Sequence, residues 1–166
     1  MTAELQSALL RHLDEADYAR FHTLAQALTG MVFNNHRRPE LERAVAETLQ
    51  ATGLADQAAL YDILQDAPAN HPARIRFVRH LTVGETHFFR NEPQFAALTQ
   101  HILPELIERK RSVRQLRIWS AGCSTGEEPY SLSILLERLL PDLADWNVLL
   151  LATDINQDAL ERAQQG

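Results

Sequence analysis

The stretch WSAGCSTGEEPY, residues 119–130, decides the fold of this chain. An apolar segment at 116–121 leads into it as a predicted strand, and a helix is expected at 129–140. The apolar run at 148–152 predicts a second strand, and Asn156 begins a further helix. Strand, helix, strand, helix is a parallel α/β unit, because two adjacent parallel strands need a crossover connection.

Four segments with apolar residues at helical spacing precede a break at Gly84 and predict an all-α bundle. Residues typical of helix ends bound these segments, namely Gly30, Pro39, Gly53, Asp56 and Pro72. In the fourth helix, we expect the buried face to consist of Ile75, Val78 and Leu81.

After the break, Asn91 can cap a helix whose apolar stripe is Phe95, Leu98 and Ile102, and Pro104 kinks or restarts it. The sequence therefore predicts an α/β chain with two domains. Residues 1–83 form a helical bundle, and residues 84–166 form the first strands and helices of an α/β domain.

Composition and charge exclude several classes of protein. The 166 residues are 45% hydrophobic and 23% charged, which indicates a globular chain. The net charge of -6 and the absence of a basic run argue against nucleic acid or an anionic membrane as partner. No apolar run approaches the roughly 18 residues of a membrane span, and the acidic N-terminus is unlike a signal peptide, so no membrane insertion and a cytoplasmic location are expected.

The cysteine and histidine content points away from disulfide and metal chemistry. Cys123 is the single cysteine, so no internal disulfide is possible, and a small loop residue is the preferred interpretation over a nucleophile. The seven histidines show no ligand spacing such as HExxH, so no metal site is expected.

The loop after the first strand consists of small residues, including Ala121 and Gly122, which let a ligand lie against the backbone. The dinucleotide fingerprint GxGxxG is absent, and the adjacent carboxylates of Glu127 and Glu128 disfavour a pyrophosphate. A cationic ligand with ribose hydroxyls fits better, and S-adenosylmethionine is such a ligand. Asp154, which ends the second strand, is the candidate for binding the ribose. The alternative for these acids is ordinary charge at helix N-termini.

Three blocks together carry a resemblance to a known family. The sequences THFFRN at 86–91, WSAGCSTGEEPYS at 119–131 and ATDIN at 152–156 resemble the CheR-type chemotaxis receptor methyltransferases in order and spacing. The resemblance implies a helical N-terminal domain followed by a Rossmann-like, doubly wound sheet. It also implies methyl transfer from S-adenosylmethionine to glutamate side chains of a protein substrate, a methyl-accepting chemoreceptor, with S-adenosylhomocysteine as product.

The resemblance assigns roles to individual residues. Thr86 and Arg90 would face the cofactor and the reacting centre, with Arg90 as the catalytic residue. Ala121 and Glu127 match loop positions that touch the cofactor, and Asp154 matches the acid that binds the ribose. A glutamate carboxylate is already an anion at neutral pH, so it needs alignment and partial neutralisation rather than a general base. The alternative for Arg90 is a surface residue near a helix start.

The aromatic pair of the first block and a cluster of arginines in the helical segment have alternative interpretations. Of Phe88 and Phe89 we expect one to be a core aromatic. In the family, a basic helix of the N-terminal domain meets the acidic receptor. Here Arg37, Arg38 and Arg43 are diluted by nearby glutamates, so a solvated face is the preferred interpretation.

The sequence holds only two strands, and a parallel sheet needs more, so we expect a truncated domain that is inactive or feeble alone. The competing functions are a non-catalytic binding or regulatory module and a methyltransferase for another substrate. A nicotinamide oxidoreductase is disfavoured by the missing fingerprint.

Overall fold

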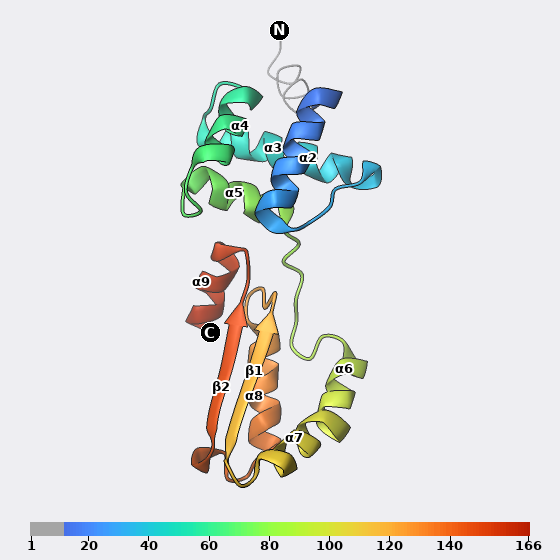
Figure 1. Cartoon of the computed structure of the whole chain (residues 1–166), viewed down its shortest axis with the longest axis vertical. Coiled ribbons are helices and arrows are strands. Elements are labelled where there is room, and N and C mark those ends of the chain that lie inside the picture. The colour runs from blue at the N-terminus through green and yellow to red at the C-terminus, as the bar shows by residue number, and fades with distance from the viewer. Residues whose placement is uncertain (1–11) are drawn as a thin grey trace. The chain divides into compact units, whose positions relative to one another are not determined.

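The computed structural model describes residues 12–166 (Figure 1). These residues form two compact units that divide between Val83 and Gly84. Each unit has its own hydrophobic core, and each is described by itself.

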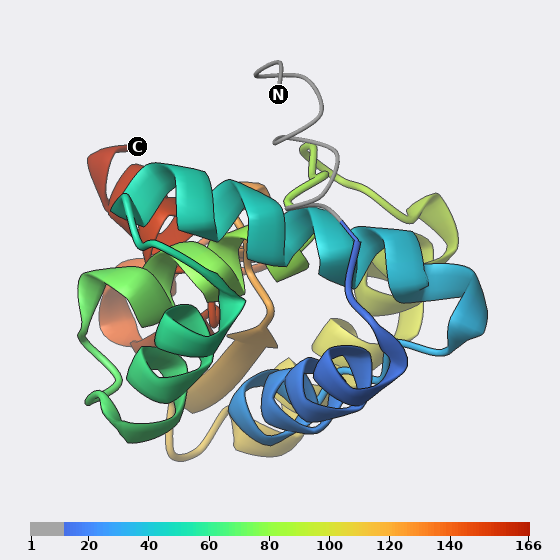
Figure 2. The same cartoon turned by 90° about the horizontal axis from the view of Figure 1, so that it is seen from above.

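The first unit is helical. Its elements are α2 (Glu15–Thr29), a 3₁₀ turn η1 (Asn35–Arg37), α3 (Arg38–Thr52), α4 (Gln57–Asp66) and α5 (Pro72–Leu81). Helices α2 and α3 cross at a steep angle, as Figures 1 and 2 show from two directions. The predicted ends are confirmed: the Asp56 carboxylate accepts the backbone N–H of Ala59 at 2.9 Å, and Gly30 and Gly53 close their helices in the left-handed conformation.

The core of this unit lies among α2, α3, α4 and α5 and contains the aromatic pair Phe21 and Phe77, whose rings are tilted by 51° with centroids 6.3 Å apart. The predicted face of α5 is wrong in part. Ala73, Phe77 and Leu81 are buried, whereas the side chains of Ile75 and Val78 are only half-buried. The helix turns its aromatic residue inward, because a ring that packs against Phe21 buries more apolar surface than a β-branched side chain does.

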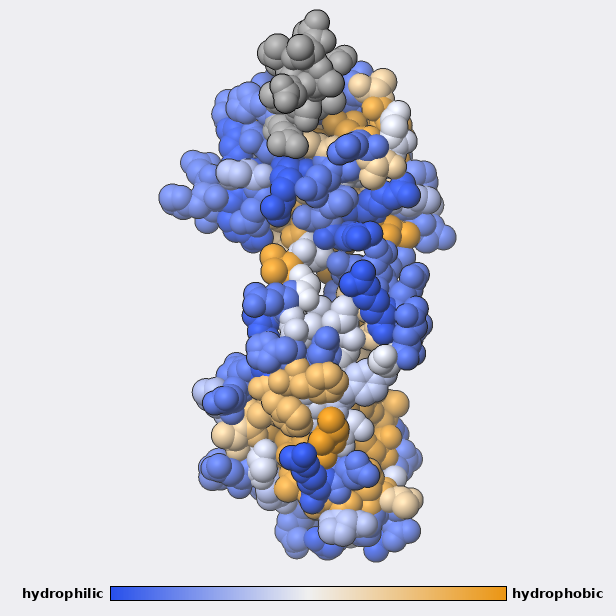
Figure 3. All heavy atoms as spheres, turned by 180° about the vertical axis from the view of Figure 1, so that it is seen from behind, coloured by the Kyte–Doolittle hydropathy of each residue, from blue (hydrophilic) through white to orange (hydrophobic). Residues whose placement is uncertain are grey.

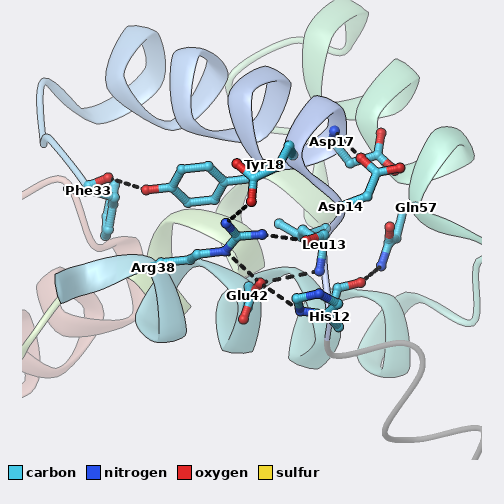
Figure 4. A network of polar contacts seen from close by, with 10 residues as sticks. His12, Leu13, Asp14, Asp17, Tyr18, Phe33, Arg38, Glu42 and Gln57 are labelled. Carbon is cyan, nitrogen blue, oxygen red and sulfur yellow. Dashed lines mark hydrogen bonds and ion pairs between the residues drawn. The ribbon is translucent and has the colours of Figure 1, made fainter. Parts of the chain in front are cut away.

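Arg38 joins the start of α2 to α3 (Figure 4). Its guanidinium donates to the carbonyl of Leu13 at 2.6 Å, to Glu15 at 2.5 Å and to Glu42 at 3.0 Å, and it stacks 4.5 Å from the centre of the Tyr18 ring. Glu42 also accepts the backbone N–H of Leu13. The predicted solvated face is wrong for Arg38, whose pair with Glu42 is mostly covered, but Arg43 is exposed and Arg37 is partly exposed, each pairing with a carboxylate of α3 at the surface.

The second unit is a parallel α/β unit, as the sequence predicts. Its elements are α6 (Glu92–Ala97), a π-helical turn η2 (Leu98–Ile102), α7 (Leu103–Lys110), β1 (Gln115–Ala121), α8 (Glu127–Leu139), a 3₁₀ turn η3 (Leu143–Asp145), β2 (Asn147–Thr153) and α9 (Gln157–Gln165). Strands β1 and β2 pair in parallel, with Gln115 opposite Asn147 and Ala121 opposite Thr153. Helix α8 starts at Glu127 rather than at Pro129, because left-handed Gly126 ends the loop.

One face of this sheet is packed and the other is exposed. Leu116 and Ser120 point into the core that α8 covers, together with the nearly buried Trp146, whose indole N–H donates to Asp142. The opposite face carries Trp119, which is 68% exposed, and half-exposed Leu149. Figure 3 shows that apolar residues also reach the surface of this unit on the side opposite to that of Figure 1. Among residues 12–166, no helix has the length and apolarity needed to cross a membrane.

Candidate functional site

The loop between β1 and α8 continues the pairing of the two strands before it turns away. The backbone N–H groups of Gly122 and Cys123 both donate to the carbonyl of Thr153, at 2.7 and 3.0 Å. Gly122 has a φ of 75°, and a Cβ placed on it would meet no heavy atom within 4 Å. Ala121 and Gly122 are both exposed. The predicted small-residue loop therefore leaves open space against its backbone, at the carboxyl ends of both strands.

Asp154 ties this loop to the one that follows β2. Its Oδ2 accepts the backbone N–H of Ser124 at 2.8 Å, and its Oδ1 accepts that of Asn156 at 2.8 Å. Each oxygen of a carboxylate can accept more than one hydrogen bond, so acceptor capacity remains on both. The two backbone N–H groups thus hold the half-buried carboxylate in a fixed orientation, and it can still accept hydrogen bonds from the hydroxyl groups of a ligand.

The two adjacent glutamates of the loop make different contacts. Glu127 accepts the hydroxyl of Thr125 at 2.7 Å, which leaves its second oxygen without a partner in the loop. Glu128 accepts the hydroxyl of Ser120 at 2.6 Å, and Ser120 is only 2% exposed. Glu128 therefore anchors the start of α8 to β1. Both glutamates are half-buried, and each accepts one hydroxyl through one of its two oxygens.

The segment that contains Thr86 and Arg90 is attached to this loop and to α8. The hydroxyl of Ser124 donates to the carbonyl of Gly84 at 3.1 Å, and the backbone N–H of Phe89 donates to the hydroxyl of Ser131 at 2.9 Å. Phe89 has a φ of 55°, a left-handed conformation that costs a non-glycine residue about 1–2 kcal/mol. The two serine contacts, together with the packing of Phe89 in the core, hold the segment in this shape.

The aromatic pair of the segment divides as predicted. Phe89 packs edge to face on Phe95 with centroids 5.2 Å apart, whereas Phe88 is 53% exposed. Arg90 is also exposed, and its guanidinium donates to the carbonyl of Glu85 while lying 4.0 Å from the carboxylate of that residue. Thr86 is half-buried.

Cys123 is buried beneath the loop, with 1% of its surface exposed. Burial raises the pKa of its thiol, and the negative charge of Asp154 raises it further. A thiol held protonated in this way is a poor nucleophile, in agreement with its interpretation as a small packing residue. Residues 12–166 contain no cluster of three or more His, Cys, Asp or Glu side chains that could hold a metal ion.

The structure thus brings four of the predicted site residues to one loop, namely Ala121, Gly122, Glu127 and Asp154. The segment that carries Thr86 and Arg90 is joined to that loop through Ser124 and to α8 through Ser131. Open backbone at Gly122 and the acceptor capacity left on Asp154 suit a ligand with ribose hydroxyls, so the residues present fit S-adenosylmethionine. Sequence reasoning missed the contacts of Ser124 with Gly84 and of Ser131 with Phe89, since these partners lie 40 and 42 positions away and no local pattern signals them.

Comparisons with the sequences of known proteins identify the family of this chain. The family described as "CheR methyltransferase, SAM binding domain" matches residues 84–166. A "Probable chemotaxis protein methyltransferase" of Rhizobium etli is 43% identical over 106 residues, which cover 64% of this chain and 40% of that protein. The "Chemotaxis protein methyltransferase 2" of Vibrio cholerae is 29% identical over 93% of this chain and 53% of its own. The "Chemotaxis protein methyltransferase" of Escherichia coli is 32% identical over 93% of this chain and 51% of its own.

Fold, loop and comparisons define the second unit as part of an S-adenosylmethionine-binding domain of the methyltransferase class. The chain belongs to the CheR methyltransferase family. It spans about half the length of the curated relatives that it matches.

Proposed function

We propose that this protein transfers a methyl group from S-adenosylmethionine to glutamate side chains of a chemoreceptor-like signalling protein. The observation that carries the proposal is the carboxylate of Asp154, which accepts the backbone N–H of Ser124 in the loop whose backbone is open at Gly122. Membership of a family whose relatives are named chemotaxis protein methyltransferases supports it. A cytoplasmic location is part of the proposal. So is the assignment of the two compact units, divided at Val83 and Gly84, as separate domains.

Within this proposal, Asp154 binds the ribose, and Glu127 lies near the cationic part of the cofactor. S-adenosylmethionine, when bound, supplies the methyl group: a glutamate oxygen bonds to the methyl carbon, the carbon–sulfur bond breaks, and its electron pair stays on sulfur. The methyl ester and S-adenosylhomocysteine that result need no proton transfer. The proposed reaction therefore requires no general base from the protein.

Arg90 is proposed to align the glutamate that receives the methyl group. Its guanidinium has five N–H donors, of which the contact with the Glu85 carbonyl engages only a part. The remaining donors can pair with a carboxylate and hold it in the orientation for attack. Thr86, Ala121 and Gly122 complete the proposed cofactor contacts.

The test uses the complete gene product. Calorimetry with S-adenosylhomocysteine measures cofactor binding, and transfer of a labelled methyl group to a receptor fragment measures the reaction. Methyl esters of glutamate release methanol in base, which separates them from methylated nitrogen. We expect Arg90→Ala to slow transfer by about 10- to 100-fold with a smaller change in cofactor affinity.

Arg109→Ala is the control, because Arg109 is also an exposed arginine, and its ion pair within residues 12–166 is with Glu105 on the same helix, α7. Full activity of the Arg90→Ala variant would refute the role given to Arg90. Cofactor binding without any transfer would favour a regulatory module instead, and a label that resists base would point to another acceptor.

A further inference from the structure

A single buried hydroxyl holds the segment that carries Arg90 against helix α8. Ser131 has 0% of its surface exposed. Its Oγ accepts the backbone N–H of Phe89 at 2.9 Å and donates to the carbonyl of Glu127 at 2.6 Å. One hydroxyl therefore bridges two parts of the proposed site that are far apart in the sequence.

The chemistry of this position requires a side chain that is short and both donates and accepts. Ser131 follows Glu127 by one helical turn, so its hydroxyl reaches the carbonyl of Glu127 as serines in helices often do. Its lone pairs remain available for the Phe89 N–H. Since that N–H belongs to a left-handed peptide, it has no regular partner in a helix or strand.

We propose that Ser131 is a positioning residue for methyl transfer. Its hydroxyl fixes the backbone N–H of Phe89, the residue before Arg90, beside the first turn of α8. The inference rests on the proposed function. Arg90 follows Phe89 directly, so the position of the Phe89 backbone determines where the Arg90 side chain leaves the main chain. A misplacement of about 1 Å at a reacting centre can cost about 100-fold in rate.

The other end of the segment has its own attachment. The hydroxyl of Ser124 donates to the carbonyl of Gly84, and the backbone N–H of Ser124 donates to Asp154. Loss of the Ser131 hydroxyl would therefore leave the segment tied at Gly84, while beside Arg90 the packing of Phe89 on Phe95 would remain without a hydrogen bond to α8. This geometry predicts a larger effect on the transfer rate than on cofactor binding.

The experiment compares three variants of the complete gene product. Ser131→Ala removes the hydroxyl, and Ser131→Thr keeps one that can bond the same helical carbonyl. Ser133→Ala is the control, because Ser133 lies on the same helix and is exposed. Amide exchange of Phe89, affinity for S-adenosylhomocysteine, kcat and the midpoint of thermal unfolding are measured for each.

For Ser131→Ala we expect the Phe89 amide to exchange about tenfold faster or more, because its N–H loses its acceptor. We expect kcat to fall by about 10- to 100-fold, and the affinity for S-adenosylhomocysteine to fall by less. Ser131→Thr should restore both Phe89 protection and kcat, and Ser133→Ala should match the unaltered protein.

Unchanged Phe89 exchange or unchanged kcat in Ser131→Ala would overturn the inference. A fall in kcat that only follows a lowered unfolding temperature would also overturn it, because that is the result of lost packing alone. If the added methyl group destabilises Ser131→Thr, the comparison of Ser131→Ala with Ser133→Ala still decides. Absence of methyl transfer by the unaltered protein would refute the proposed function itself.

Discussion

Replacing Asp154 by asparagine tests whether its carboxylate holds two loops as well as a ligand. Each carboxylate oxygen accepts one backbone N–H, from Ser124 and from Asn156. An asparagine has only one oxygen. In either orientation of its amide, one of these N–H groups therefore faces an NH₂ group, which is also a donor.

The size of the effect follows from these two bonds. A hydrogen bond to a charged group contributes about 1.5–3 kcal/mol, and one between neutral groups about 0.5–1.5 kcal/mol. The variant keeps one bond in neutral form and loses the other. Because Asp154 is half-buried, water replaces part of the lost bond, and we expect the local free energy of opening to fall by about 1–3 kcal/mol.

Native-state amide exchange measures this quantity directly. The amides of Ser124 and Asn156 should exchange about 5- to 150-fold faster in Asp154→Asn, and the affinity for S-adenosylhomocysteine should fall as well. Asp145→Asn is the control, because its exposed ion pair with Arg114 is worth at most about 1 kcal/mol. Unchanged protection of both amides in Asp154→Asn would refute the reasoning, even if ligand affinity fell.

Two further predictions concern a glycine and a histidine. Gly126→Ala should destabilise the second unit more than Gly122→Ala does. Both glycines have a positive φ, but only a Cβ on Gly126 would lie 3.0 Å from Ala163. In urea unfolding we expect a loss of about 1–2 kcal/mol for Gly122→Ala and a larger loss for Gly126→Ala, and equal losses would contradict this. Burial lowers the pKa of His80, although Glu47 at 2.8 Å opposes the shift. As the pH falls below the ordinary value of 6.5, the unfolded chain is protonated first, so the first unit should lose stability between about pH 7 and pH 5. His80→Gln should lessen that loss in urea unfolding at the two pH values, and an identical pH dependence in both proteins would show that other groups cause it.

The helix ends were predictable because the residues that form them act locally. Gly30, Gly53 and Asp56 cap or close their helices through contacts within a few residues, so their chemistry is visible in a short window of sequence. The buried face of α5 was not, because the choice of Phe77 over Ile75 depends on Phe21, which lies on another helix. Helical spacing alone allows either stripe.

The same distinction applies to the candidate site. The small loop residues and Asp154 follow predicted strands, so the parallel pairing brings them together at one edge of the sheet. The contact between Ser131 and Phe89 joins residues 42 positions apart, and the serine carries no signal of its own. Functional roles of Thr86 and Arg90 stay predictions, since resemblance rather than spacing suggests them.

The placement of the two tryptophans decides which spectroscopic signal reports on which part of the molecule. Trp119 and Trp146 are the only tryptophans of the chain, and both belong to the second unit. Trp146 is buried and Trp119 is exposed beside the candidate site. Indole emission therefore follows the second unit alone, and unfolding should shift it to longer wavelength. Far-ultraviolet circular dichroism follows the helices of both units, so two transitions with different midpoints would resolve their separate stabilities in one titration.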